Sequence, residues 1–366
     1  MARELAQAGH HVEVFETRSH VAGNCHTERH PAGPLVHIYG PHIFHTQHEH
    51  VWDYIRRFGE MVPYVHRVKA TVGGTVFSLP VNLLTINQFF GTALDPTGAA
   101  ALIRSKAEPG DQPPATFEDQ ALAFVGRELY EAFFAGYTRK QWGVDPAELP
   151  ASVLARLPVR FSYDDSYFNH PWQAIPRHGY TPIVEAVLDH PGISVHLQTP
   201  WSGGSFDHVV WTGPIDAWFG HANGRLGYRT LDFETEVREG DAQGCPVMNY
   251  CDVGVPWTRI TEHKHFAPWE QHAATVLYRE YSRACDDADV PYYPIRLVKE
   301  KAQLLEYVRL AEATDGVTFM GRLGTYRYLD MDVTIHEALA CARAMLRALE
   351  DGSPLPTFSV HPLGGS

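Results

Sequence analysis

The chain has 366 residues, a formal net charge of −13 and 44% hydrophobic residues, enough to build sizeable cores in two or three domains. The acidic charge argues against a nucleic-acid partner, and no apolar run approaches the roughly 18–20 residues that span a membrane. Five scattered cysteines, none in a C-x-x-C pair, fit reduced thiols. Because the start also has no signal-peptide pattern, we expect a cytoplasmic protein that does not enter a membrane.

The first elements in chain order predict an incomplete dinucleotide-binding (Rossmann) unit. Residues 3–9 read as the end of a helix, and residues 11–16 as a short buried strand that ends in Glu16. An acidic residue in this place binds a ribose hydroxyl in such units. No Gly-x-Gly-x-x-Gly turn, which lets the backbone approach a pyrophosphate, occurs in the chain. We therefore expect an α/β fold whose truncated Rossmann-like domain lacks its first strand and glycine turn.

The remaining elements divide the chain into three interleaved parts. A hairpin is predicted over residues 64–81, mostly helices over 85–155, strands over 190–275, and helices again over 299–313 and 333–350. The expected domains are a discontinuous Rossmann-like domain, a helical insert with a loop near 150–165, and an antiparallel sheet domain. The Rossmann-like domain is predicted over residues 1–62, 180–225 and 310–366. The helical insert is predicted over 85–179, and the sheet domain over 63–84 and 226–309.

Three loop-like stretches combine arginine, tyrosine, tryptophan and acids. Residues 136–142 and 156–169 are typical of an anion clamp, because arginine binds phosphate bidentately and tyrosine hydroxyls add donors. Side chains alternate over residues 257–266 as in a strand, which places Arg259 and the following polar residues on one face. Residues 321–332 lead into a helix whose N-terminus suits a pyrophosphate. Each stretch also has a plainer interpretation: a solvated loop, an exposed strand face and an ordinary Asp cap.

Several motifs occur in one order along nearly the whole chain: Gly40-Pro-His-Ile-Phe-His-Thr46, Tyr137-Thr-Arg-Lys-Gln-Trp142, Arg156-Leu-Pro-Val-Arg160-Phe, Asn169-His170, Gly179-Tyr-Thr, Thr212-Gly-Pro-Ile-Asp216, Glu262-His-Lys-His-Phe266, Pro291-Tyr-Tyr-Pro294 and Tyr328-Leu-Asp-Met-Asp332. In this order they strongly resemble the UDP-galactopyranose mutase family. The resemblance implies a discontinuous flavin domain, a helical domain with a mobile loop, and an antiparallel sheet. It also implies interconversion of pyranose and furanose forms of a nucleotide sugar, and a homodimer.

The resemblance also assigns roles to residues at matching positions. Arg156 resembles the mobile-loop arginine and Arg259 the second arginine of the diphosphate site, and His45 matches a histidine under the flavin. The other implied roles are diphosphate binding by Tyr167, Tyr293 and Tyr328, nucleobase contact by Phe133, Phe134 and Tyr137, and a place beside the sugar for Trp142, Arg322 and Asp330. Phe168 and Asn249 complete the expected substrate-binding set.

Departures from the family pattern concern the expected flavin pocket. The glycine turn is absent, a family Gly-Gly-Asn reads Ala22-Gly23-Asn24, a usual Asn is His66, and a family glycine is Ala174. The chain therefore looks like a flavin-free branch that acts on GDP-linked sugars and needs a divalent metal. We accordingly expect Mg²⁺ or Mn²⁺, with unknown ligands, and no FAD.

A flavin-free mechanism would need other groups to stabilise the sugar cation. A metal on the diphosphate would neutralise the leaving group, and the sugar 4-hydroxyl would attack the anomeric carbon. This route needs a base and an acid, for which His45, His66 and Asp330 are the candidates, with Arg322 beside them. Each also has a structural interpretation, as a hydrogen-bonded pocket histidine or a capping aspartate.

Two alternatives stay open. The first is an FAD-dependent UDP-galactopyranose mutase whose N-terminus is truncated. The second is a protein that binds nucleotide sugars without catalysis, although the retained Arg156, Arg259, Tyr293 and Tyr328 argue against a decayed site. The sequence fixes neither the sugar nor the nucleobase.

Overall fold

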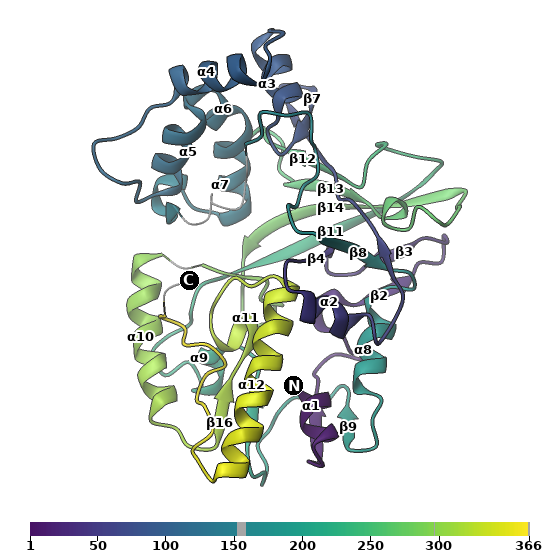
Figure 1. Cartoon of the computed structure of the whole chain (residues 1–366), viewed down its shortest axis with the longest axis vertical. Coiled ribbons are helices and arrows are strands. Elements are labelled where there is room, and N and C mark those ends of the chain that lie inside the picture. The colour runs from purple at the N-terminus through teal and green to yellow at the C-terminus, as the bar shows by residue number, and fades with distance from the viewer. Residues whose placement is uncertain (152–158, 296, 365–366) are drawn as a thin grey trace.

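The computed structural model describes residues 1–151, 159–295 and 297–364. Figure 1 shows a helical part at one end, a large twisted sheet across the middle, and an α/β part that contains both the first and the last helices. No helix in the described part of the chain is both long and apolar enough to cross a membrane.

The α/β part is assembled from distant segments. Strand β1 (Val12–Phe15) pairs in parallel with β9 (Ile193–His196), and β10 (Val209–Trp211) pairs in parallel with β16 (Val317–Phe319). Parallel neighbours require crossover connections, which explains why this part is discontinuous in sequence. Among the described residues these pairs form two separate two-stranded sheets. Their helices are α1 (Ala2–Gln7), α8 (Tyr180–Leu188), α9 (Ile215–Trp218), α10 (Val298–Glu312), α11 (Gly321–Gly324) and α12 (Met331–Asp351).

The helical part is well defined by its caps. The Asn82 side chain accepts from Thr85 at the start of α3 (Leu83–Phe90), Asp95 caps α4 (Pro96–Lys106), and Thr116 forms a capping box with Asp119. Next come α5 (Phe117–Val125), α6 (Arg127–Leu129), a π-helical stretch η2 (Tyr130–Ala135), α7 (Gly136–Trp142) and a short turn η3 (Pro146–Glu148). Part of the predicted loop near 150–165 lies outside the described residues. This part includes Arg156.

A seven-stranded sheet forms the middle of the molecule. Its order is β15 (Tyr293–Pro294), β11 (Tyr228–Glu239), β14 (Ala274–Ala284), β13 (Arg259–Glu262), β12 (Val247–Tyr250), β6 (Val68–Val72) and β7 (Thr75–Leu79). The predicted hairpin is present, with a turn at Gly73 and Gly74, whose φ angles of 55° and 76° favour glycine. The sheet is mixed and not wholly antiparallel, because β12 and β6 run in parallel.

Smaller elements fill the junction between the three parts. Strand β8 (Trp172–Pro176) pairs with both β4 (Phe44–Thr46) and β5 (Met61–Pro63), so the end of the segment predicted as the helical domain is a strand. The other short elements are η1 (Gly23–Cys25), β2 (Thr27–Arg29), β3 (Leu35–His37), α2 (Glu49–Ile55) and η5 (His263–Phe266). The junction brings together the residues described next.

Candidate functional site

Three aromatic rings from different parts of the chain meet at one place. Tyr293 of β15 stacks on Tyr328, which follows α11, with ring centroids 5.5 Å apart. Trp142, at the end of α7, lies 6.2 Å from the first ring and 6.3 Å from the second. Helix α7 ends here because Gly143 has a φ of 68°, and a Cβ at this position would lie 2.3 Å from the Arg229 guanidinium.

Arg322 lies against these rings and is held by the backbone. Its Cζ is 4.8 Å from the Tyr328 ring centroid and 5.8 Å from that of Tyr293. Its guanidinium donates to the carbonyls of Leu329 and Tyr292, the latter at 3.1 Å. The side chain is therefore fixed in orientation while its charge stays beside the aromatic cluster.

Arg259 supplies a second, more buried positive charge. It lies opposite Glu280 in the β13–β14 ladder, and its Nε donates to Oε2 of that residue at 2.7 Å. The other oxygen of Glu280 accepts from Thr258 Oγ1 at 3.1 Å. Burial lowers the Arg259 pKa, but Glu280, Tyr137 and Tyr293 outweigh burial and hold this pKa well above its usual value. Its terminal nitrogens make no side-chain hydrogen bond within the described residues, so they can bind an anion.

Aromatic and imidazole rings form the adjoining wall. His45 stacks on Phe168 with centroids 3.7 Å apart, and its Nδ1 lies 2.7 Å from Nδ1 of His170. The His66 ring lies 6.0 Å from Phe168 and 5.6 Å from Tyr167. Burial raises the Tyr167 pKa, with smaller contributions from Arg259, which lowers it, and from Tyr328 and Asp330, which raise it.

His66 is neutral at physiological pH. Burial, with smaller contributions from Arg259 and His45, lowers its pKa to about 3. Its Nδ1 is buried and has no hydrogen-bond partner in the described part of the molecule. A role as a protonated general acid is therefore excluded at neutral pH, whereas a neutral hydrogen-bonding role is compatible with this pKa.

The depressed pKa of His66 makes stability depend on pH. An unfolded histidine titrates near pH 6.5, so between about pH 6.5 and 3 the unfolded state binds a proton that the folded state excludes. The free energy of unfolding therefore falls as the pH falls through this window. We expect His66→Asn to shrink the loss between pH 7 and pH 4.5, measured by urea denaturation, by about 2 kcal/mol. The exposed His178→Asn serves as the control, and an equal pH dependence in wild type and His66→Asn contradicts the assignment.

The structure also adds residues that sequence reasoning missed. Burial lowers the pKa of His42 to about 4, with smaller contributions from Arg322 and Arg259, so His42 lies near both arginines. Its Nδ1 lies 2.9 Å from the Gly40 carbonyl, which only accepts, so Nε2 carries the lone pair. His42 stood in the Gly40–Thr46 motif and could have been found there. His170 likewise stood in the Asn169-His170 motif. Glu280 could not have been found, because cross-strand partners have no signal in sequence spacing.

Other predicted substrate residues have mixed placements. Asn249 of β12 is directly opposite Arg259, so the two side chains lie on one face of the sheet. Tyr137 raises the Arg259 pKa electrostatically, so its hydroxyl lies near the Arg259 guanidinium. Phe133 and Phe134 are 4% and 7% exposed, and the Phe133 ring packs 5.2 Å from Phe77 in the helical core. This burial leaves Phe133 little surface for stacking on a base.

Lys140 fixes the segment that leads into β13. Four backbone carbonyls lie within hydrogen-bond distance of its Nζ and share its three N–H donors: those of Tyr250 at 2.6 Å, Val255 at 2.9 Å, and Asp252 and Trp257 at 3.0 Å. Burial lowers the pKa of Lys140. Since Trp257 precedes Arg259 by two residues, this one ammonium group positions the start of the arginine-bearing strand.

The end of β1 fits an anionic dinucleotide cofactor. Glu16 accepts from the Arg18 backbone at 2.9 Å, and the Arg18 side chain donates to Asn24 at 2.8 Å. Its other terminal nitrogen is buried and, within the described residues, has no partner. Arg18 lies over the Tyr39 ring at 4.6 Å, and Tyr39 lies 6.5 Å from Tyr292, whose carbonyl binds Arg322. An anion at Arg18 would therefore lie next to the aromatic cluster.

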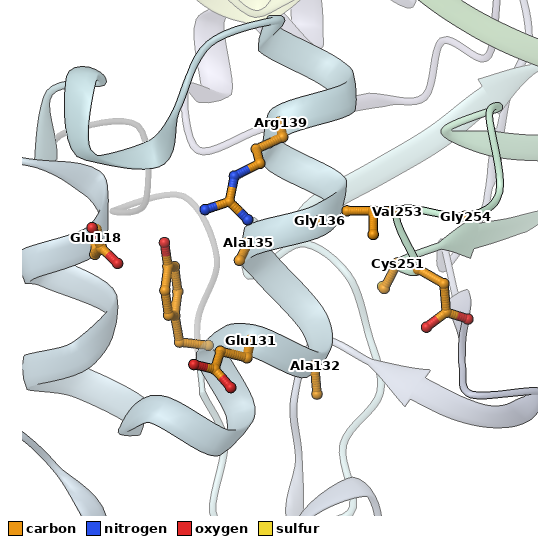
Figure 2. Close-up of a pocket in the computed structure, with 11 residues that line it drawn as sticks. Glu118, Glu131, Ala132, Ala135, Gly136, Arg139, Cys251, Val253 and Gly254 are labelled. Carbon is orange, nitrogen blue, oxygen red and sulfur yellow. The ribbon is translucent and has the colours of Figure 1, made fainter.

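A cavity of about 420 Å³ lies elsewhere, between the π-helical stretch, α7 and the loop at residues 251–254. Figure 2 shows Glu118 and Glu131 around it together with Arg139. Asp252 adds a third carboxylate, and Arg139 is already paired with Asp145 at 3.1 Å. This acidic lining disfavours a diphosphate. The candidate site is therefore the arginine–tyrosine cluster, which consists of Arg259, Arg322, Tyr137, Tyr293 and Tyr328.

Comparisons with known proteins identify the family of the chain. Residues 132–328 match the family model of UDP-galactopyranose mutase, and residues 1–58 match that of the NAD(P)-binding Rossmann-like domain. The chain is 56% identical to a probable UDP-galactopyranose mutase of Klebsiella pneumoniae, over 98% of this chain and 95% of that protein. It is 50% identical to dTDP-fucopyranose mutase of Escherichia coli, with 95% of each chain covered.

Solved structures agree on the fold. A crystal structure of reduced UDP-galactopyranose mutase superposes with a TM-score of 0.73 at 15% identity, covering 95% of this chain and 92% of that one. The expected α/β architecture with a Rossmann-like domain is thereby confirmed.

These findings overturn the expectation of a divalent-metal enzyme that needs no FAD. The Rossmann-like match over residues 1–58 shows that the dinucleotide-binding fold is recognisable without the Gly-x-Gly-x-x-Gly turn. Moreover, neither group of possible metal ligands in the described part of the chain includes a residue of the arginine–tyrosine cluster. The relatives named above carry UDP- and dTDP-sugar names, which give no support to a GDP-linked substrate.

Proposed function

We propose, because this chain belongs to the UDP-galactopyranose mutase family, that it uses FAD to interconvert pyranose and furanose forms of a UDP- or dTDP-linked hexose. The observation that carries the proposal is the arginine–tyrosine cluster. Arg259 and Arg322 gather positive charge beside Tyr137, Tyr293 and Tyr328 in a chain whose net charge is −13. Such a concentration of donors suits a diphosphate.

The substrate class follows from the named relatives. Uracil and thymine are both pyrimidines, and fucose is galactose without its 6-hydroxyl group. We therefore expect a substrate whose sugar has the galacto configuration. The substituent at C6 of the sugar and the pyrimidine nucleoside are the two features that differ between the candidate substrates. Asn249, opposite Arg259, and Tyr137 are the proposed contacts to the nucleoside side of the ligand.

Arg259 is the main residue that stabilises negative charge on the leaving diphosphate. When the bond between the anomeric carbon and the diphosphate breaks, negative charge grows on the leaving group. Arg259 is held in place by Glu280 before the reaction, so it can stabilise this charge without reorganisation. Tyr167 and Tyr293 keep their protons, because burial raises the pKa of each hydroxyl, and both serve as neutral donors. The Tyr328 hydroxyl is proposed as a further donor. Arg156, proposed as the mobile-loop arginine of the diphosphate site, lies outside the described residues.

The remaining residues hold the cofactor and the sugar. We assign Glu16 to a ribose hydroxyl of FAD, and Arg18 with Asn24 to its diphosphate. Arg322, His45 and Asp330 are assigned to the neighbourhood of its ring. A bound reduced flavin supplies the nucleophile for the anomeric carbon. Neutral His66 and His42 orient hydroxyl groups, because neither carries a proton that it can give up as an imidazolium at pH 7.

Product analysis tests this proposal. The protein is incubated under dithionite with UDP-galactopyranose, dTDP-fucopyranose and GDP-linked galactose, and the products are separated by ion-pair chromatography. We expect furanose product from one or both pyrimidine-linked substrates and much slower turnover of the GDP-linked sugar. Preferred turnover of the GDP-linked sugar contradicts the proposed substrate class. Binding of all three without any product supports the non-catalytic alternative.

A further inference from the structure

Three histidines outside the arginine–tyrosine cluster converge where α2 meets α12. His48 caps the start of α2, His50 lies in its first turn, and His336 lies in α12. Nε2 of His50 is 2.9 Å from Nδ1 of His336, and the His48 ring stacks on His336 with centroids 4.5 Å apart. One ring nitrogen from each of the three lies within 4.8 Å of the others. Figure 1 shows α2 beside α12, and the two helices are in contact.

We propose that His48, His50 and His336 bind a first-row transition metal ion of the Zn²⁺ class. Two imidazole nitrogens on one tetrahedral ion, at Zn–N lengths of about 2.0–2.1 Å, are about 3.3 Å apart. The observed 2.9 Å between His50 and His336 is close to this separation, and the exposed His50 ring can turn without disturbing the core. Three imidazoles select zinc, nickel or copper over magnesium, which prefers oxygen ligands.

The surroundings of His336 favour its neutral form, in which a ring nitrogen can bind a metal ion. Burial, together with His48 and His50, lowers the pKa of His336. Asp332, one helical turn before His336, is 2% exposed, and its Oδ1 has no hydrogen-bond partner among the described residues. Its negative charge is felt at His336 and would partly offset the charge of a bound cation.

A second group of possible ligands carries no comparable argument. Glu262, with Asp241 and His265, is already an acceptor for the backbone of Ala242 at 2.9 Å and of Gln243 at 2.8 Å. Its lone pairs are therefore engaged in holding a loop, whereas the three histidines have ring nitrogens directed mainly at one another.

The metal is structural and not a reactant. It would link the segment after β4 to α12. Strand β4 contains His45, and α12 begins directly after Asp330. A bound ion would therefore hold together two elements that each bring a residue to the proposed active site, without contacting the substrate.

Zinc titration of the EDTA-treated full chain tests the proposal. We expect one Zn²⁺ per chain by calorimetry, a rise in Tm with ZnCl₂ but not with MgCl₂, and at least about tenfold weaker binding in His50→Asn and in His336→Asn. His50 is exposed, so its variant should fold as the wild type does. The control is His196→Asn, which removes another exposed histidine that pairs with a carboxylate, Glu13. Unchanged zinc affinity in the His50 variant, or loss of binding only in the His196 variant, overturns the proposal.

Discussion

Arg259→Met is expected to lower kcat/KM by about 10²–10³, the usual loss when one charge-stabilising donor is removed from a transition state. The methionine keeps an unbranched apolar stem but removes the guanidinium, which is the only cation that faces both Glu280 and the tyrosine hydroxyls in the described residues. The measurement is steady-state furanose formation from the preferred substrate of the chromatographic assay.

Two further variants separate chemistry from folding. Arg259→Met leaves Glu280 buried without its cation, which destabilises the fold by itself. Adding Glu280→Gln should restore Tm but not activity. The matched control is Arg279→Met on the neighbouring strand β14, whose arginine pairs with Glu234 at 2.8 Å. Comparable losses of activity in the Arg259 and Arg279 variants contradict the proposed role of Arg259.

Lys140→Met is expected to destabilise the protein by at least about 3 kcal/mol, because four partly buried carbonyls lose a charged donor. The measurement is the free energy of unfolding by urea denaturation. Activity at temperatures below the transition should also fall, since the start of β13 no longer holds Arg259 in place.

Arg139→Met is the control for Lys140. Arg139 is the preceding residue, is more exposed, and pairs with Asp145 at 3.1 Å on the outside of the helix. Surface ion pairs of this kind contribute about 0–1 kcal/mol, so this variant should change stability little. An equally small effect of Lys140→Met shows that the segment at residues 250–257 is held by other contacts.

Much of the proposed site could be predicted from sequence motifs. The structure brings Arg259, Arg322, Tyr293, Tyr328 and Trp142 together from three separate parts of the chain, as their motifs implied. Glu280 could not be found in this way, because its partnership with Arg259 depends on the register of two strands. The mixed sheet escaped prediction for the same reason: a parallel β12–β6 pair joins segments almost 180 residues apart.

The cofactor expectation failed because it rested on the missing glycine turn and on three further departures around the expected flavin pocket, at Ala22, His66 and Ala174. A Gly-x-Gly-x-x-Gly turn is a strong sign of a dinucleotide site when it is present, but other features of the fold remain when it is absent. Here they include Glu16 at the end of β1, the partly unpaired Arg18 guanidinium, and the parallel strand pairs. The expected nucleobase contact of Phe133 rested on its being aromatic. Core packing favours an aromatic side chain as much as base stacking does, and Phe133 is buried in the helical core.

The ultraviolet–visible spectrum of the purified full chain, recorded with saturating FAD and coupled to turnover, tests the central claim most directly. After unbound FAD is removed, we predict the visible absorption of an oxidised isoalloxazine ring at about one FAD per chain, and furanose formation only after dithionite bleaches it. Full turnover by colourless protein without a reductant contradicts the account.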